Sequence, residues 1–213
     1  ANGDSATSLG ASVTVAAARL LRMADRRKEH SALMVSEAPA LLRHAAPVDV
    51  IHVKYEYAEA LSSLGRHVEA TKLARESYLT ARELFGDLSN PTTRSFAEQF
   101  VSLSKRSAGT LSSELFDLAT ALHDEDRKQF GPTSPTALLS GMRLVLLTPP
   151  SRSENLIRDL GRVLDDIESW RESAPLLSQE RVHWWGTFVH MFALASALPD
   201  PRDQSSKRWD LQF

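Results

Sequence analysis

The chain has 213 residues, of which 42% are hydrophobic and 24% are charged, with a formal net charge of −2 and no cysteine. A chain of this length can bury one sizeable core or one continuous run of repeats, and the absence of cysteine excludes disulfides, thiolate metal sites and cysteine nucleophiles. The slightly acidic balance argues against binding to nucleic acid, and no run approaches the roughly 20 apolar residues that a membrane-spanning helix needs, so we expect no transmembrane segment.

The first elements are a tail and a basic helix. Residues 1–10 are polar and predict an N-terminal tail. Residues 11–28 predict an amphipathic helix whose polar side gathers Arg19, Arg22, Arg26 and Arg27. This basic side is either a solvated face of a packed helix or a surface for an anionic or acidic partner. Residues 31–44 predict a weaker helix that Pro39 interrupts, ending one piece and beginning another.

A helical hairpin is predicted over residues 49–86, where two apolar runs at helical spacing flank Gly65. A single hairpin cannot bury both of its faces, and the chain supplies neighbours at a fixed interval. Pro47, Pro91 and Pro135 follow one another at steps of 44 residues, each where a helix would begin. The glycine between the two runs recurs at the same step as Gly109. The residues before these three prolines are Ala46, Asn90 and Ser134, and a further step of 44 places Ser178 at the same point. Three of these four residues, all but the alanine, are good N-caps.

Alignment at this step produces columns of apolar or small residues. One column holds Tyr57, Val101, Val145 and Val189, a second holds Val53, Ala97, Gly141 and Trp185, and a third holds Val50, Arg94, Leu138 and Val182, with Arg94 as the exception. The second helices of the pairs are predicted at residues 68–85, 111–130 and 152–171. The pattern therefore predicts an all-α solenoid of antiparallel helix pairs, with about nine helices in a single domain over residues 11–198.

The end of one pair and the start of the next carry a family resemblance. Phe85-Gly86 is followed by Pro91-Thr92, and small residues stand at Ala58, Gly65, Ala70 and Ser77. Residues 57–92 thereby resemble tetratricopeptide repeats of the long-period, kinesin-light-chain type, although the period also fits HEAT or armadillo repeats. The resemblance implies a right-handed solenoid with a concave surface that binds a peptide or a neighbouring subunit, and no catalysis.

The last predicted helix, residues 178–198, is apolar around most of its circumference and must be covered on more than one side. Either the preceding helices and the tail cover it, or another protein does. Residues 199–213 predict an extended C-terminal tail that folds back on this helix or adds to a partner. The candidate partner-binding residues are Trp184, Trp185, Phe188, Phe192, Trp209, Leu211 and Phe213, together with Arg19, Arg22 and Arg26 of the first helix.

No pattern indicates catalytic chemistry, a cofactor or a metal. His183 and His190 lie seven residues apart on a predicted helix with no further ligand nearby, and packing or exposure explains them better than metal binding. The acidic clusters at residues 124–126 and 165–168 lack the glycine-bearing loop of a calcium site and are interpreted as solvated faces. Phosphate loops, nucleophile elbows and dinucleotide fingerprints are absent from the sequence.

The sequence therefore predicts a noncatalytic protein–protein interaction scaffold, a structural or accessory subunit of a larger complex whose partners are other subunits or peptide segments. The alternative is an RNA-binding helical-repeat protein, supported by the basic side of residues 11–28 with Lys105, Arg106, Lys128 and Arg143. Because the chain begins at Ala1, one hypothesis is an intracellular protein of an organelle such as the mitochondrion, from which a presequence has been removed.

Overall fold

The computed structural model describes residues 2–108, 112–147, 162, 163, 165–167, 169 and 170. These residues form helices joined by short turns and contain no strand, which confirms the predicted all-α class. The packing of the helices divides the chain into two compact units, Ala1–Gly109 and Thr110–Phe213, and each is described by itself.

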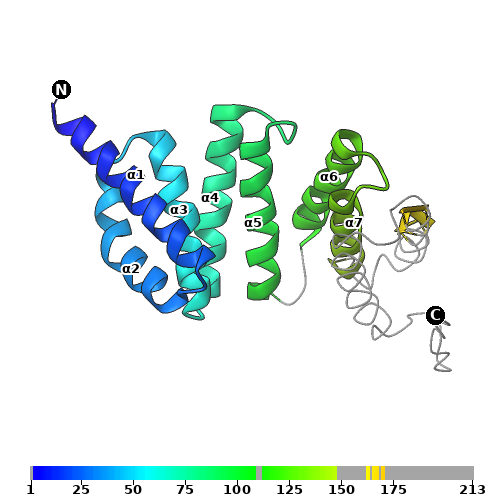
Figure 1. Cartoon of the computed structure of the whole chain (residues 1–213), viewed down its shortest axis with the longest axis horizontal. Helices are drawn as coiled ribbons and strands as arrows, with labels where there is room; N and C mark the ends of the chain where they lie inside the picture. Colours follow the sequence, from blue (N-terminus) through cyan, green and yellow to red (C-terminus); the bar gives the residue numbers. More distant parts are fainter. Residues whose placement is uncertain (1, 109–111, 148–161, 164, 168, 171–213) are drawn as a thin grey trace. The chain divides into compact units, whose positions relative to one another are not determined.

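The first unit consists of five helices that pack in chain order (Figure 1). They are α1 (Asn2–Met23), α2 (Arg27–His44), α3 (Pro47–Ser63), α4 (His67–Phe85) and α5 (Pro91–Ala108). Each helix contacts the next one along the chain, and α3 also contacts both α1 and α5. The third helix is therefore the element around which this unit is built.

The prolines at the 44-residue step begin helices as predicted. Pro47 is the first residue of α3, Pro91 of α5, and Pro135 of α7 (Pro135–Leu147) in the second unit. Proline suits this position because the first backbone N–H of a helix has no acceptor and the ring fixes a helical φ. Asn90 Oδ1 accepts a hydrogen bond from the Thr92 backbone N–H at 2.9 Å, and Ser134 Oγ accepts one from Ala137 at 3.2 Å, whereas Ala46 provides no side-chain cap.

The helix ends also follow the sequence. Gly86 and Gly131 come directly after Phe85 and Phe130 and have φ angles of 89° and 87°, which favour glycine. Gly65 has a φ of 78° in the turn between α3 and α4. Gly109 lies outside the described residues.

Small residues line the contacts among α3, α4 and α5. Ala58, Ala70 and Ser77, which the family resemblance singled out, are completely buried, as is Ala74. Their size lets the helix backbones approach closely, and aromatic rings fill the remaining space. Tyr55 meets the ring of Phe96 edge-on at 5.3 Å, and Tyr78 stacks on Phe100 at 6.2 Å; in the same layer, Ile51, Leu61 and Leu103 are fully buried.

The first two helices differ from the prediction. Residues 2–10 were predicted as a tail but form the first part of α1, because nothing in their sequence stops a helix. The helix ends before Asp25, which has a φ of 54° in the turn to α2. Arg27 therefore begins α2 and does not end α1. Pro39 was predicted to break the second helix, but α2 runs through it. Because Pro39 lies on the exposed face, water can bond the carbonyl that its ring deprives of a partner.

The second unit contains α6 (Ser113–Phe130) packed on α7, and residues 162–170 are helical wherever they are described. Asp126 is buried, so the interpretation of residues 124–126 as a solvated face was wrong for this residue. Arg127 forms an ion pair with the partly buried Asp166, so the interpretation was also wrong for this residue of the second cluster, whereas Asp165 is exposed. This ion pair joins α6 to the segment after α7.

Several predicted features lie outside the described residues: the full helix at 152–171, the helix at 178–198 and the tail at 199–213. The predicted total of about nine helices includes these segments. Among the described helices, none combines the length and the apolar character needed to cross a membrane.

Candidate functional site

The three arginines predicted to bind a partner, Arg19, Arg22 and Arg26, all contact carboxylates of their own chain. Arg22 donates from Nε and Nη2 to the two carboxylate oxygens of Glu56, at 3.2 and 3.4 Å. The Nε of Arg19 lies 3.4 Å from Glu56 Oε1, and the Nη2 of Arg26 lies 3.1 Å from Glu29 Oε1. Arg19 and Arg22 on the basic side of α1 thus contact α3 within the chain. The sequence had suggested either a solvated face or a surface for a partner, and neither includes this internal contact.

Glu56 is 0% exposed and connects three helices. His30 of α2 contributes a third contact, with its Nε2 at 3.2 Å from Glu56 Oε2. Burial by itself raises the pKa of Glu56, but the hydrogen bonds from His30 and Arg22 and the charge of Arg22 outweigh it, so the pKa lies below its ordinary value. The carboxylate is therefore charged at neutral pH. Its position among Val53, Tyr57 and Ala60 on the apolar side of the helix was the signal available in the sequence.

A cavity of about 360 Å³, which we call the smaller cavity, lies beside Arg19 and Arg22. These arginines line it together with His52, Tyr55 and the first residues of α5. Arg19 Nη2 lies 3.0 Å from His52 Nδ1. Burial, and then the charge of Arg19, lower the pKa of His52, so its ring is neutral at pH 7 and Nδ1 accepts this hydrogen bond. Glu56 neutralises one of the two guanidinium charges, so this cavity keeps the positive charge of the other.

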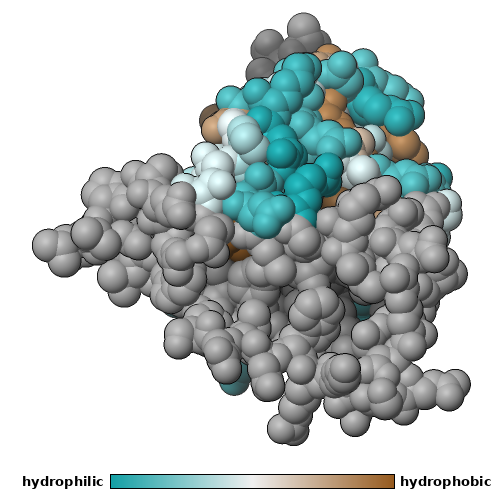
Figure 2. All heavy atoms as spheres, turned by 90° about the vertical axis from the view of Figure 1, so that its right-hand side faces the viewer, coloured by the Kyte–Doolittle hydropathy of each residue, from teal (hydrophilic) through white to brown (hydrophobic). Residues whose placement is uncertain are grey.

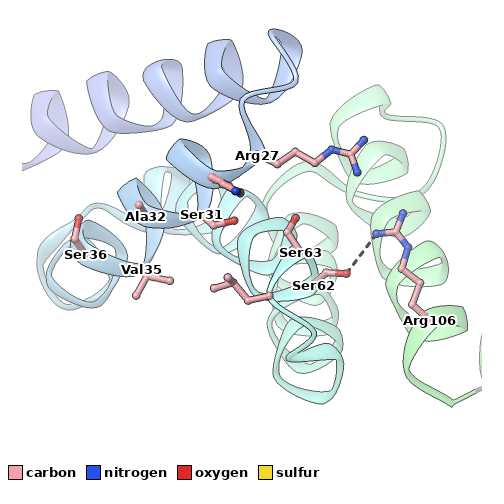
Figure 3. Close-up of a pocket in the computed structure, with 10 residues that line it drawn as sticks. Arg27, Ser31, Ala32, Val35, Ser36, Ser62, Ser63 and Arg106 are labelled. Carbon is pink, nitrogen blue, oxygen red and sulfur yellow. Dashed lines mark hydrogen bonds between the residues drawn. The ribbon is translucent and has the colours of Figure 1, made fainter.

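A larger groove of about 660 Å³ lies between α2, the C-terminal end of α3 and α5 (Figure 3). We call it the α2–α3–α5 groove. Its cations are Arg27, Lys28 and Arg106; its hydroxyl groups belong to Ser31, Ser36, Ser62 and Ser63; and its apolar residues are Ala32, Val35 and Leu64. The groove thus combines three positive charges with hydroxyl and apolar groups.

Local structure explains how these residues meet. The turn at Asp25 begins α2 at Arg27, and helical spacing then places Ser31 and Val35 on the same side, one and two turns later. Gly65 ends α3 just beyond Ser62 and Ser63. On α5, Arg106 Nη1 donates to Ser62 Oγ at 3.3 Å, as the dashed line in Figure 3 marks.

The charges of the α2–α3–α5 groove are largely unbalanced. None of its lining residues is a carboxylate. Arg27 Nε bonds Asp25 Oδ1 at 2.8 Å, but both side chains are highly exposed, and such pairs contribute little. Within the described part of the chain, Lys28 and Arg106 form no ion pair. This is the main electrostatic difference from the smaller cavity.

Ser31 is the most enclosed hydroxyl of the groove. Its residue is only 4% exposed, and in the part of the chain that the structure describes its hydroxyl has no hydrogen-bond partner. Its Oγ is not among the buried polar atoms that lack a partner in the described residues, so water or a ligand acceptor can bond it from the groove. By contrast, Ser36 and Ser63 donate to the Leu33 and Glu59 carbonyls of their own helices at 3.0 Å.

The serines of the groove have no histidine or carboxylate beside them among its lining residues. No group of three or more possible metal ligands exists among the described residues.

The other predicted site residues, Trp184, Trp185, Phe188, Phe192, Trp209, Leu211 and Phe213, lie outside the described residues, and their role stays a prediction. On the side of the molecule shown in Figure 2, the described atoms are mostly hydrophilic, with small hydrophobic areas among them. In the sequence Arg27 and Arg106 are recognisable only as basic residues, because nothing in it shows that α2 and α5 bring them to one groove.

No protein-family model matches the chain, and no curated protein matches it either.

Proposed function

We propose that this chain is a noncatalytic helical-repeat module that binds a segment of another protein, as an accessory subunit of a larger complex. The observation that carries the proposal is the α2–α3–α5 groove, which is built from three helices and lined by positively charged, hydroxyl and apolar side chains. Grooves between stacked helices are the surfaces that repeat proteins use to hold peptide segments.

Contacts between positions 44 residues apart support a helical repeat of this period. Gln99 Nε2 donates to the Tyr55 carbonyl at 2.9 Å, and the Arg106–Ser62 bond also spans 44 residues. Val53 and Ala97, which share a predicted column, are both fully buried. Successive repeats of a solenoid place equivalent residues next to each other. We therefore favour a repeat of antiparallel helix pairs for the first unit, in which one pair begins at Pro47 and the next helix begins at Pro91.

Photocrosslinking in the native source tests this function. A photoreactive amino acid at Val35, which is 39% exposed in the groove, should crosslink to one or a few defined proteins. The matched control is Val48, which is 47% exposed on α3 and does not line the groove. An absence of crosslinks from Val35, or the same products from both positions, would contradict a binding role for the groove.

A further inference from the structure

We infer that the α2–α3–α5 groove binds its peptide segment through a phosphorylated serine or threonine side chain. This inference rests on the proposed function and specifies its ligand. A phosphoryl group carries about −1.5 to −2 charges at pH 7 and offers three acceptor oxygens. The groove has cations to attract this charge and hydroxyl groups that can donate to these oxygens.

The two arginines of the groove are directed to one end of it. In Figure 3 the side chains of Arg27 and Arg106 extend toward the same end of the groove, away from Val35. Like charges placed together repel each other, and a dianion between them turns this repulsion into attraction. A carboxylate with a single charge satisfies one guanidinium, whereas a phosphoryl group has oxygens for both.

One further donor fits the same ligand. The Ser31 hydroxyl lies one helical turn after Arg27 and lines the groove. The first turn of α2 also holds Glu29, whose carboxylate accepts a hydrogen bond from its own backbone N–H and pairs with Arg26. The positive charge at this end of the groove therefore comes from the side chains of Arg27 and Lys28.

The rest of the groove fits a peptide better than a free ion. Its volume of about 660 Å³ lies within the range of about 300–1,000 Å³ that is typical of sites for organic ligands. Val35 and Leu64 offer exposed apolar surface there, suited to an apolar residue near the phosphorylated one. RNA fits less well, because the lining contains no aromatic side chain on which a base could stack.

Fluorescence anisotropy of the whole chain tests the inference with a labelled peptide library that has a central phosphoserine and varied flanking residues. We expect affinity at least about tenfold higher than for the same library with unmodified serine or with glutamate, because charge-assisted hydrogen bonds to two arginines are lost in these. The double variant Arg27→Gln/Arg106→Gln should remove most of this difference. Arg43→Gln, an exposed change on α2 outside the groove, should leave it intact.

Four results would overturn the inference: equal binding of the serine library, equal binding of the glutamate library, phosphoserine binding unchanged in the double variant, or tighter binding of oligouridylate that the double variant abolishes. Circular dichroism of each variant checks that the helices are retained. Lys28→Gln changes the third cation of the groove, which is exposed like the two arginines of the double variant. If Val35 crosslinks to proteins but phosphorylation has no effect, this inference alone fails. If Val35 also gives no crosslinks, the proposed function fails with it.

Discussion

Glu56 illustrates how a single buried charge can organise neighbouring helices. Its carboxylate is fully buried, yet it accepts hydrogen bonds from Arg22 and contacts Arg19 and His30 on two other helices. Desolvation of a carboxylate costs several kcal/mol, and only nearby cations and donors offset that cost. Because the two arginines are about half exposed, they can regain water when the carboxylate is removed. The cost of losing Glu56 should therefore be smaller than for a fully buried ion pair.

We expect Glu56→Gln to lower the free energy of unfolding by about 1–3 kcal/mol at pH 7, because the amide presents a donor where two cations need an acceptor. The folded-state pKa of Glu56 is lowered, so its contribution is present above the ordinary carboxyl pKa and is lost as the pH falls through the folded value. Urea unfolding at several pH values should therefore show the difference from wild type shrinking below about pH 4.

The control for this prediction is Glu29→Gln, which removes an exposed carboxylate that pairs with the exposed Arg26 and bonds its own backbone N–H. It should leave stability nearly unchanged. Equal effects of the two substitutions, or a Glu56 effect that does not depend on pH, would contradict the described network.

The sequence could not specify the site residue by residue. The basic residues Arg27 and Arg106 were visible in it, but their convergence depends on the packing of α2 and α5 against the end of α3. The burial of Asp126 was missed for the same reason, since two of its acidic neighbours in sequence, Asp124 and Glu125, are more exposed. Periodicity reports which side of a helix is apolar, and it does not report which polar residues a neighbouring helix covers.

At the scale of elements, α2 contains a proline that a helix interior tolerates poorly. Pro39 lacks the N–H that would bond to the Val35 carbonyl, and its ring crowds that carbonyl. We expect Pro39→Ala to raise the free energy of unfolding by about 1–3 kcal/mol, since alanine restores the bond at an exposed position. The gain is reduced because alanine also makes the unfolded chain more flexible.

Chemical unfolding followed by circular dichroism measures the Pro39 effect, with Ala40→Ser as a neighbouring exposed change that leaves the backbone bonds intact. A loss of stability in Pro39→Ala would mean that the helix depends on the kink or on the fixed φ of proline.

Element boundaries were predictable wherever a residue acts on the backbone directly. The proline starts of α3, α5 and α7 and the glycine ends after Phe85 and Phe130 were all confirmed. The start of α1 and the continuity of α2 were not, because propensity over residues 2–10 and solvent access at Pro39 decide them. Local steric rules are thus readable in a sequence, whereas competition between weak preferences is settled by the surrounding structure.

At the scale of the whole molecule, each unit has its own tightly packed position. Ala70 is fully buried between the helices of the first unit. In the second unit, a Cβ added to Gly141 would lie 2.8 Å from His123 Cε1 and 2.9 Å from Val163 Cγ2. Both of these neighbours are buried and cannot move aside freely. Ala70→Phe and Gly141→Ala should therefore each overpack one unit, at a cost of about 1–3 kcal/mol, partly offset for Gly141→Ala by the better helix propensity of alanine.

The sequence predicts a single domain over residues 11–198, and this stays a prediction; the helices form two compact units divided at Gly109. If each unit has its own core, thermal unfolding by calorimetry should show two transitions, of which Ala70→Phe lowers one and Gly141→Ala lowers the other. Val68→Phe, at an exposed position two residues before Ala70, should move neither. One transition lowered by both variants would instead mean that the two units unfold together, because a cooperative transition reports the stability of everything that melts in it. The choice between one cooperative solenoid and two units thus depends on how these two melting temperatures respond.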